Sequence, residues 1–132
     1  MASGSIKTTR HPMRYYNPSI YANGSGEITI ERSDCNYVVT EDFLFLSGRF
    51  HLLTTNGGNG NICIPYPSGV TCGNAGVGIV GYVGLAAAHP IQALSIRAND
   101  SDFCYVQYGA GNYSVPAIGA DTWVLYNALI PR

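Results

Sequence analysis

Charged side chains are scarce in this 132-residue chain, which has seven Lys and Arg against eight Asp and Glu. They make up 11% of the residues, whereas an ordinary soluble domain carries about 25%. Because no basic cluster is present to neutralise phosphates, the sequence excludes a typical nucleic-acid-binding protein. The 46% of apolar residues can offset the entropy of ordering, so we expect one folded domain and not a disordered chain.

Long apolar runs are also missing. The longest, residues 77–88, is interrupted by Gly78, Gly81 and Gly84, and no run of uncharged apolar residues reaches the length of about 18 residues that spans a membrane. The first residues, 1–7, lack the apolar core of a signal peptide. We therefore expect synthesis in a cytoplasm and no membrane insertion.

Metal-ligand patterns are absent as well. Cys35, Cys63, Cys72 and Cys104 form no C-x-x-C pair and have no His at ligand spacing, so no metal is expected. Without a secretory signal, the cysteines are expected to be reduced and to pack as small apolar side chains. Cys63 and Cys72 are the one pair worth testing for a disulfide.

Recognisable catalytic motifs are missing too, so neither enzyme activity nor a cofactor is expected. Ser47, His51 and Asp42 form a triad only on paper, because any chain with this much Ser permits such a set. The adjacent Glu41 and Asp42 would point to opposite faces of a strand and could not flank one glycosidic bond. The glycine-rich residues 57–60 lack the Lys and the helix of a phosphate-binding loop.

Short segments of alternating polarity dominate the rest of the chain. Residues 43–53 carry apolar side chains at every second position, and similar segments recur with turn signals between them. No amphipathic helix interrupts the series. We predict an all-β domain over residues 26–132, an antiparallel β-sandwich or jelly-roll-like fold of about seven or eight strands.

Several local features refine this prediction. Ser33 and Asp34 predict a turn, and the polar, glycine-rich residues 54–61 predict the tip of a hairpin. Gly48, inside an apolar strand, predicts a bulge or a close backbone approach. Trp123, the only Trp, precedes an apolar strand and is expected in the core.

Residues 1–25 show neither a helical nor a strand period, and Pro12 and Pro18 exclude a continuous helix. We expect an extended N-terminal arm, either a frayed tail or a clasp on a neighbouring subunit. The side chains that could anchor such a clasp are Met13, Tyr15, Tyr16, Ile20 and Tyr21.

Polar uncharged and aromatic residues are expected to cover the surface, where charged residues usually predominate. Tyr is amphipathic and common at interfaces, so its ten copies favour a subunit of a symmetric oligomer. Tyr side chains could equally stack on sugar rings beside amides. The candidates for glycan or subunit contact are Tyr66, Tyr108, Asn112 and Tyr113.

One order of features runs through residues 37–67. An aromatic-Val-Val strand is followed by an acidic turn, a strand closing on Ser47-Gly48-Arg49-Phe50, a glycine-rich tip and the segment Ile62-Cys63-Ile64-Pro65-Tyr66-Pro67. This order resembles a β-sandwich domain of bacteriophage tail fibres, tailspikes and baseplate proteins, and the resemblance extends over residues 35–129. Ile64 departs from the Leu that usually precedes the Pro in that family.

The resemblance implies a non-enzymatic virion protein, made in the host cytoplasm. It implies a homotrimer that contacts other virion proteins and attaches to a host-surface glycan, most simply as a tail-fibre or tail-tip component. It transfers no catalytic residues. Two alternatives stay open on the sequence: a capsid decoration protein that stabilises the head, and a lectin-like carbohydrate-binding module that belongs to no virion.

Overall fold

The computed structural model describes residues 11–73, 79–85, 94–98, 100–108 and 112–132. Nearly all regular structure in these residues is β, which confirms the predicted all-β class. The strands are β1 (Arg14–Tyr16), β2 (Tyr21–Ala22), β3 (Thr29–Val39), β4 (Phe43–Thr54), β5 (Ile62–Pro65), β6 (Ile79–Leu85), β7 (Leu94–Arg97), β8 (Phe103–Tyr108), β9 (Asn112–Tyr113) and β10 (Thr122–Pro131). A five-residue helix, α1 (Ser114–Ile118), lies between β9 and β10. No helix in the described residues has the length and apolar character to cross a membrane.

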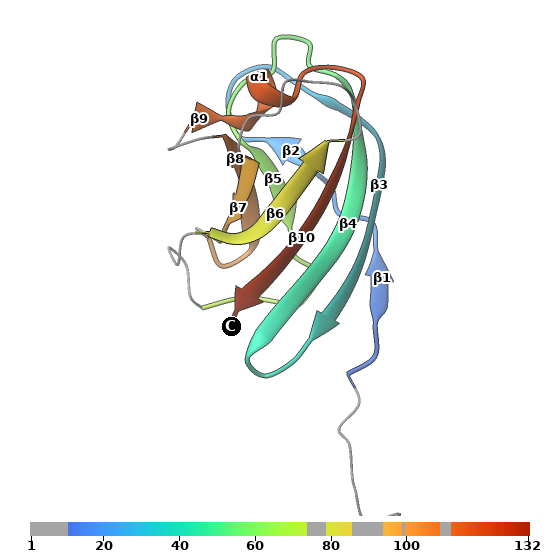
Figure 1. Ribbon diagram of the computed structural model, residues 1–132, viewed down its shortest axis with the longest axis vertical. Helices are drawn as coiled ribbons and strands as arrows, with labels where there is room; N and C mark the ends of the chain where they lie inside the picture. The colour runs from blue at the N-terminus through green and yellow to red at the C-terminus, as the bar shows by residue number, and fades with distance from the viewer. Residues whose placement is uncertain (1–10, 74–78, 86–93, 99, 109–111) are drawn as a thin grey trace, which may run out of the picture.

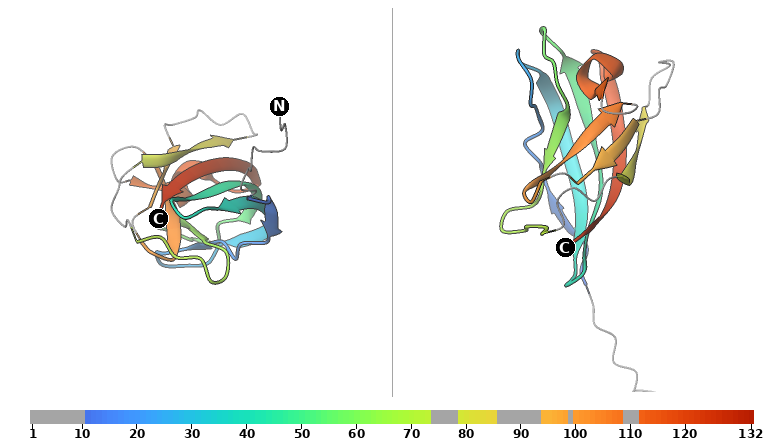
Figure 2. Two further views of the ribbon diagram at one scale, coloured as in Figure 1. Left: turned by 90° about the horizontal axis from the view of Figure 1, so that it is seen from below. Right: turned by 90° about the vertical axis from the view of Figure 1, so that its left-hand side faces the viewer.

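The strands form one antiparallel sheet in the order β1-β3-β4-β10-β6-β7-β8-β5-β2, with β9 beside β8. The sheet curls so that its two halves face each other across one core, as the layers of a sandwich do (Figures 1 and 2). The Tyr16 hydroxyl in β1 donates a hydrogen bond of 2.8 Å to the carbonyl oxygen of Pro65 in β5. This bond ties the first edge of the sheet to the opposite half.

The core is filled from alternate positions of the strands, as the period of two predicts. In β10, every second side chain from Thr122 to Ile130 is buried. Burial of each large apolar side chain contributes about 1.5–3 kcal/mol. The largest fully buried side chains include Phe50, Leu44, Leu46, Leu52, Ile62, Ile64, Ile96, Ile118 and Ile130.

The four cysteines are free and buried, and no bridge joins Cys63 to Cys72. Their predicted role as small buried side chains is therefore confirmed. Burial raises the pKa of the Cys63 thiol to about 11 and raises that of the Cys104 thiol as well. Both thiols are accordingly protonated near neutral pH.

The predicted turn at Ser33 and Asp34 is wrong, because β3 runs through both residues. Ser33 pairs with Phe50 and Asp34 with Arg49, within a continuous register between β3 and β4. The irregularity of β3 lies earlier, around Glu31, where the register with β4 shifts. Cross-strand partners on β4 therefore override the turn preference of Ser and Asp.

The glycine-rich residues 54–61 are not a hairpin tip, since β4 and β5 are not neighbours in the sheet. They cross from one half of the curled sheet to the other and lie against residues 23–26. The backbone N–H of Gly24 donates to the carbonyl oxygen of Asn59 at 3.0 Å. A Cβ at Gly24 would lie 2.3 Å from that oxygen, so the close approach requires glycine.

The described part of the expected arm belongs to the sheet of its own chain. β1 pairs with β3 and β2 with β5. Ile20, between them, is buried in the core, and the half-buried Tyr16 packs edge-to-face on Tyr37 with centroids 5.2 Å apart. These contacts correct the predicted arm over residues 14–22. Residues 1–10 lie outside the described residues.

Candidate functional site

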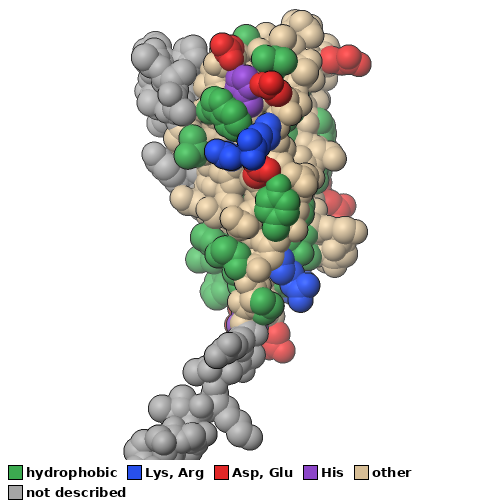
Figure 3. Space-filling model, turned by 90° about the vertical axis from the view of Figure 1, so that its right-hand side faces the viewer, with side chains coloured by type: hydrophobic (Ala, Val, Ile, Leu, Met, Phe, Trp, Pro, Cys, Tyr) green, Lys and Arg blue, Asp and Glu red, His purple; other side chains and the backbone are tan. Residues whose placement is uncertain are grey.

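The solvent-facing side of β1, β3, β4 and β10, here called the outer face, carries the richest side-chain chemistry among the described residues. Directly opposed residues form successive rows across β3, β4 and β10. Figure 3 shows arginines, carboxylates and a histidine with hydrophobic side chains among them in the upper part of this face, and further hydrophobic side chains lower down. The rows are Arg32–His51–Trp123, Asp34–Arg49–Leu125, Asn36–Ser47–Asn127 and Val38–Phe45–Leu129.

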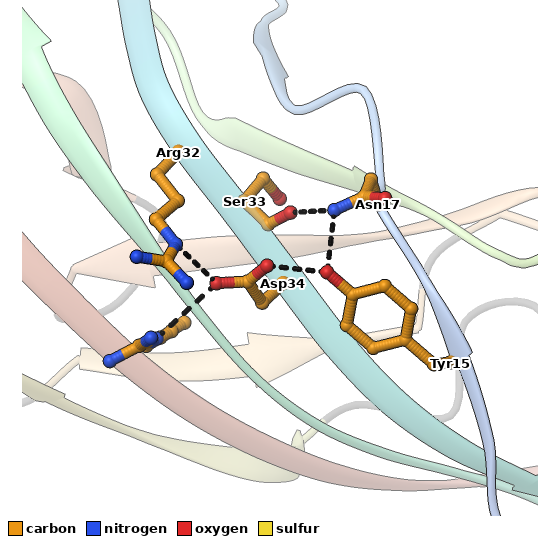
Figure 4. Close-up of polar contacts among 6 residues, drawn as sticks. Tyr15, Asn17, Arg32, Ser33 and Asp34 are labelled. Atoms are coloured by element: carbon orange, nitrogen blue, oxygen red, sulfur yellow. Dashed lines mark hydrogen bonds and ion pairs between the residues drawn. The ribbon is translucent and has the colours of Figure 1, made fainter.

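Asp34 is the centre of a hydrogen-bonded cluster on this face (Figure 4). Its Oδ1 accepts a bond of 2.5 Å from the Tyr15 hydroxyl, and its Oδ2 accepts from Nε of Arg32 at 2.8 Å and of Arg49 at 3.4 Å. Asn17 Nδ2 donates to the Tyr15 oxygen and to the carbonyl oxygen of Ser33, both at 2.8 Å. The Tyr15 bond, followed by the two guanidinium groups, lowers the pKa of Asp34, so its carboxylate is ionised.

A groove of about 420 Å³ opens beside this cluster and is called the outer groove. Gly48 lines the groove through its backbone, between the outward-facing side chains of Ser47 and Arg49. A smaller hollow of about 240 Å³ continues the groove towards Asn127. The groove is lined by Tyr15, Arg32, Asp34, Asn36, Ser47, Gly48, Arg49 and Leu125.

The row Asn36–Ser47–Asn127 lies across the groove. None of these three side chains makes a hydrogen bond to another described residue. Two amides and one hydroxyl offer both donors and acceptors. The row can therefore hydrogen-bond a ligand whose own groups both donate and accept.

His51 lies in the row above the Asp34 cluster. Its Nδ1 contacts Glu31 Oε2, and its Nε2 lies 2.8 Å from Asp121 Oδ1. Asp121, then Glu31, raises the pKa of the imidazole. The indole of Trp123 stacks on this imidazole with ring centroids 4.9 Å apart. The His51 side chain is only 9% exposed.

One sequence prediction fails beside His51. Trp123 lies half-buried on the outer face and not in the core, because it is out of phase with the buried residues of β10. His51 lies against the carboxylates of Glu31 and Asp121, and the described residues hold no group of three ligands that could bind a metal. Ser47 lies four residues from His51, about 13 Å along the strand, so the two cannot form a catalytic pair.

The predicted glycan or subunit contacts do not form one site. Tyr108 pairs with Asn112 between β8 and β9, and the neighbouring Tyr113 is 54% exposed. The side chain of Asn112 lies outside the described part of the chain. Tyr66 lies beyond the other end of β8, where its N–H bonds to the carbonyl oxygen of Asp102, and it is buried in the core. Its burial corrects the prediction of an exposed loop residue.

The predicted arm anchors separate into core and surface positions. Tyr16 and Ile20 pack in this chain's own core, whereas Tyr15 lines the outer groove. Tyr21, 41% exposed, contacts Phe103 edge-to-face, and Met13 is exposed. Sequence analysis thus named Tyr15 but missed Asp34, Asn36, Ser47, Arg49 and Asn127.

An apolar band covers the lower part of the outer face. Two rows form the band, Val38–Phe45–Leu129 and the neighbouring pair Phe43–Pro131. Leu129 is 50% exposed and Phe43 is 43% exposed. None of the side chains in these two rows is charged. This apolar band consists of Val38, Phe43, Phe45, Leu129 and Pro131.

No protein-family model matches the chain, and no curated protein and no solved structure matches it.

Proposed function

We propose that this protein is a non-enzymatic attachment protein that binds a carbohydrate in the outer groove, as a tail-fibre or tail-tip component of a bacteriophage. The observation that carries the proposal is the row Asn36–Ser47–Asn127, whose polar groups are not engaged by described residues. Sugar hydroxyls both donate and accept, as amides do. Tyr15, at the β1 side of this row, adds an aromatic ring beside the amides.

The construction of the groove supports recognition by a fixed surface. Its polar side chains stand on paired strands, which hold them more rigidly than loops do. Tyr15 is held by Asp34 and by Asn17. A site that is ordered before binding loses less conformational entropy when the ligand arrives.

The virion setting rests on the resemblance to tail-fibre domains and is supported by the apolar band. An exposed apolar surface of this kind is typical of contacts between proteins, so the proposal includes a homotrimer in contact with other virion proteins. The same band favours a second candidate, a capsid decoration protein. A decoration protein would bind purified capsids and no saccharide, whereas a lectin-like module would bind saccharide as a monomer.

A glycan array followed by calorimetric titration tests the proposal. Asn36→Ala and Asn127→Ala should each weaken saccharide binding about tenfold, the equivalent of about 1.4 kcal/mol. Ser68→Ala, on an exposed loop, is the matched control and should bind like the wild type. Tyr113→Ala tests the alternative location on β9. Loss of binding in Tyr113→Ala alone, or the absence of any bound saccharide, would overturn the proposal.

A further inference from the structure

We infer that the outer groove selects an acidic saccharide, whose carboxylate or sulfate group binds between Arg32 and Arg49. This inference rests on the proposed function and names the ligand class of the same groove. It is carried by the way in which the two guanidinium groups are held.

Both arginines use the same atom for the ion pair with Asp34. Nε of Arg32 and Nε of Arg49 approach the same carboxylate oxygen, at 2.8 and 3.4 Å. The terminal Nη groups of both side chains make no hydrogen bond to a described residue. The side chains are 58% and 49% exposed, so these donors are accessible from the groove.

The charged side chains that line the groove are two arginines and one carboxylate. Two guanidinium groups share one carboxylate, Asp34, which leaves one positive charge without a direct partner. The next carboxylates on this face, Glu31 and Asp121, both contact the imidazole of His51. An anionic ligand would therefore meet donors and positive charge at the Asp34 row.

The two arginines are also held in place. Asp34 is fixed on its other oxygen by Tyr15, and Cζ of Arg49 lies 5.3 Å from the ring centroid of Trp123. A guanidinium group fixed through Nε still presents two terminal donors, the geometry that binds carboxylate and sulfate oxygens in pairs. The loss of side-chain entropy on binding is correspondingly small.

The arrangement places the anion site next to the amide row. Asp34 and Asn36 point to the same face two residues apart on β3, which is about 7 Å. Arg49 and Ser47 likewise point to this face, two residues apart on β4. One sugar unit can therefore place its acidic substituent between the arginines and its hydroxyls on the amides.

The inference is tested with saccharides in matched acidic and neutral forms. Polygalacturonate oligomers are compared with their methyl esters, and dextran sulfate with dextran, by calorimetric titration of the full chain. We expect the wild type to bind at least one acidic form about tenfold more tightly than its neutral partner. Comparing the two pairs distinguishes a carboxylate from a sulfate.

Arginine variants show whether the groove causes the preference. Arg32→Gln and Arg49→Gln should reduce the affinity for the acidic form about tenfold and leave that for the neutral form within about twofold. Arg49→Lys keeps the charge but loses the paired donors, so its affinity should be intermediate. Arg14→Gln removes one exposed positive charge from β1 outside the groove lining and should change nothing.

The results distinguish the preference for an acidic saccharide from the more general proposal that the groove binds carbohydrate. Equal binding of acidic and neutral forms, or equal losses in Arg14→Gln and Arg49→Gln, would overturn the acidic preference and leave carbohydrate binding intact. Failure to bind every saccharide would overturn both proposals. Circular dichroism of each variant confirms that the fold is retained.

Discussion

The imidazole of His51 lies parallel to the indole of Trp123, with centroids 4.9 Å apart and an interplanar angle of 11°. The two residues are directly opposed on β4 and β10. Glu31 and Asp121 contact the two ring nitrogens of His51. A side chain on the outer face is thereby buried by neighbours from two other segments of the chain, β3 and the start of β10.

This environment makes stability depend on pH. Asp121, then Glu31, raises the pKa of His51 above its ordinary value of 6.5. A raised folded-state pKa gives a stabilising contribution that is complete below pH 6.5 and is lost as the pH rises through the folded-state value. We expect the free energy of unfolding to fall between pH 6 and pH 8 in the wild type, in urea titrations.

His51→Gln isolates this effect, because the substitution removes the titrating group. The difference in stability between wild type and His51→Gln should therefore shrink as the pH rises. A difference that is constant from pH 6 to pH 8, or that grows, would contradict the assigned contacts of His51.

Gly48→Ala should destabilise the fold by about 1–3 kcal/mol, the range for overpacking. The added Cβ would lie 2.5 Å from the hydroxyl oxygen of Tyr126 and 2.7 Å from the backbone oxygen of Asp34. Gly73→Ala is the matched control, because nothing lies within 4 Å of a Cβ there. Chemical denaturation that finds both variants equally stable would show that β3 does not approach β4 as described.

Tyr16→Phe should lower the free energy of unfolding by about 1 kcal/mol, since it removes the hydrogen bond to the Pro65 carbonyl oxygen. Tyr37→Phe is the control. Tyr37 belongs to the same edge-to-face pair, yet its hydroxyl makes no hydrogen bond to a described residue. Equal losses of unfolding free energy in the two variants would mean that the Tyr16 hydroxyl does not join the two halves of the curled sheet.

From the apolar band we predict that the protein assembles into a trimer. Light scattering on a sizing column should find three chains of 14.1 kDa, about 42 kDa in total. Leu129→Arg would place a charge in the band and should yield the 14.1 kDa monomer. Leu53→Arg, at an exposed position of β4 outside the band, should remain trimeric. A monomeric wild type would contradict the trimer and favour a decoration protein or a lectin-like module.

The strand positions were predictable where burial imposes a period of two. Residues 43–53 show it clearly, and the apolar positions Leu44, Leu46, Phe50 and Leu52 are all buried. The three residues of β1 are too few to display a period, so their pairing with β3 could not be foreseen. Trp123 did carry a usable signal, because it is out of phase with Val124 and Tyr126 of the same strand.

The outer groove was hidden because it depends on strand register. Asp34 and Arg49 are fifteen residues apart and meet only because β3 pairs with β4 without a turn at Ser33. The turn preference of Ser and Asp suggested the opposite. Asn36 and Asn127 come together only through β4, which lies between their strands, and no local pattern could reveal that neighbourhood.

The central claim is that a saccharide binds in the outer groove, and an NMR titration of backbone amides tests it most directly. The ligand is a saccharide selected on the glycan array, added to isotope-labelled full-length protein. We predict saturable shift changes centred on Asn36, Ser47 and Arg49, with none at Tyr113. Changes confined to β8 and β9, or no changes at saturating ligand, would contradict the claim.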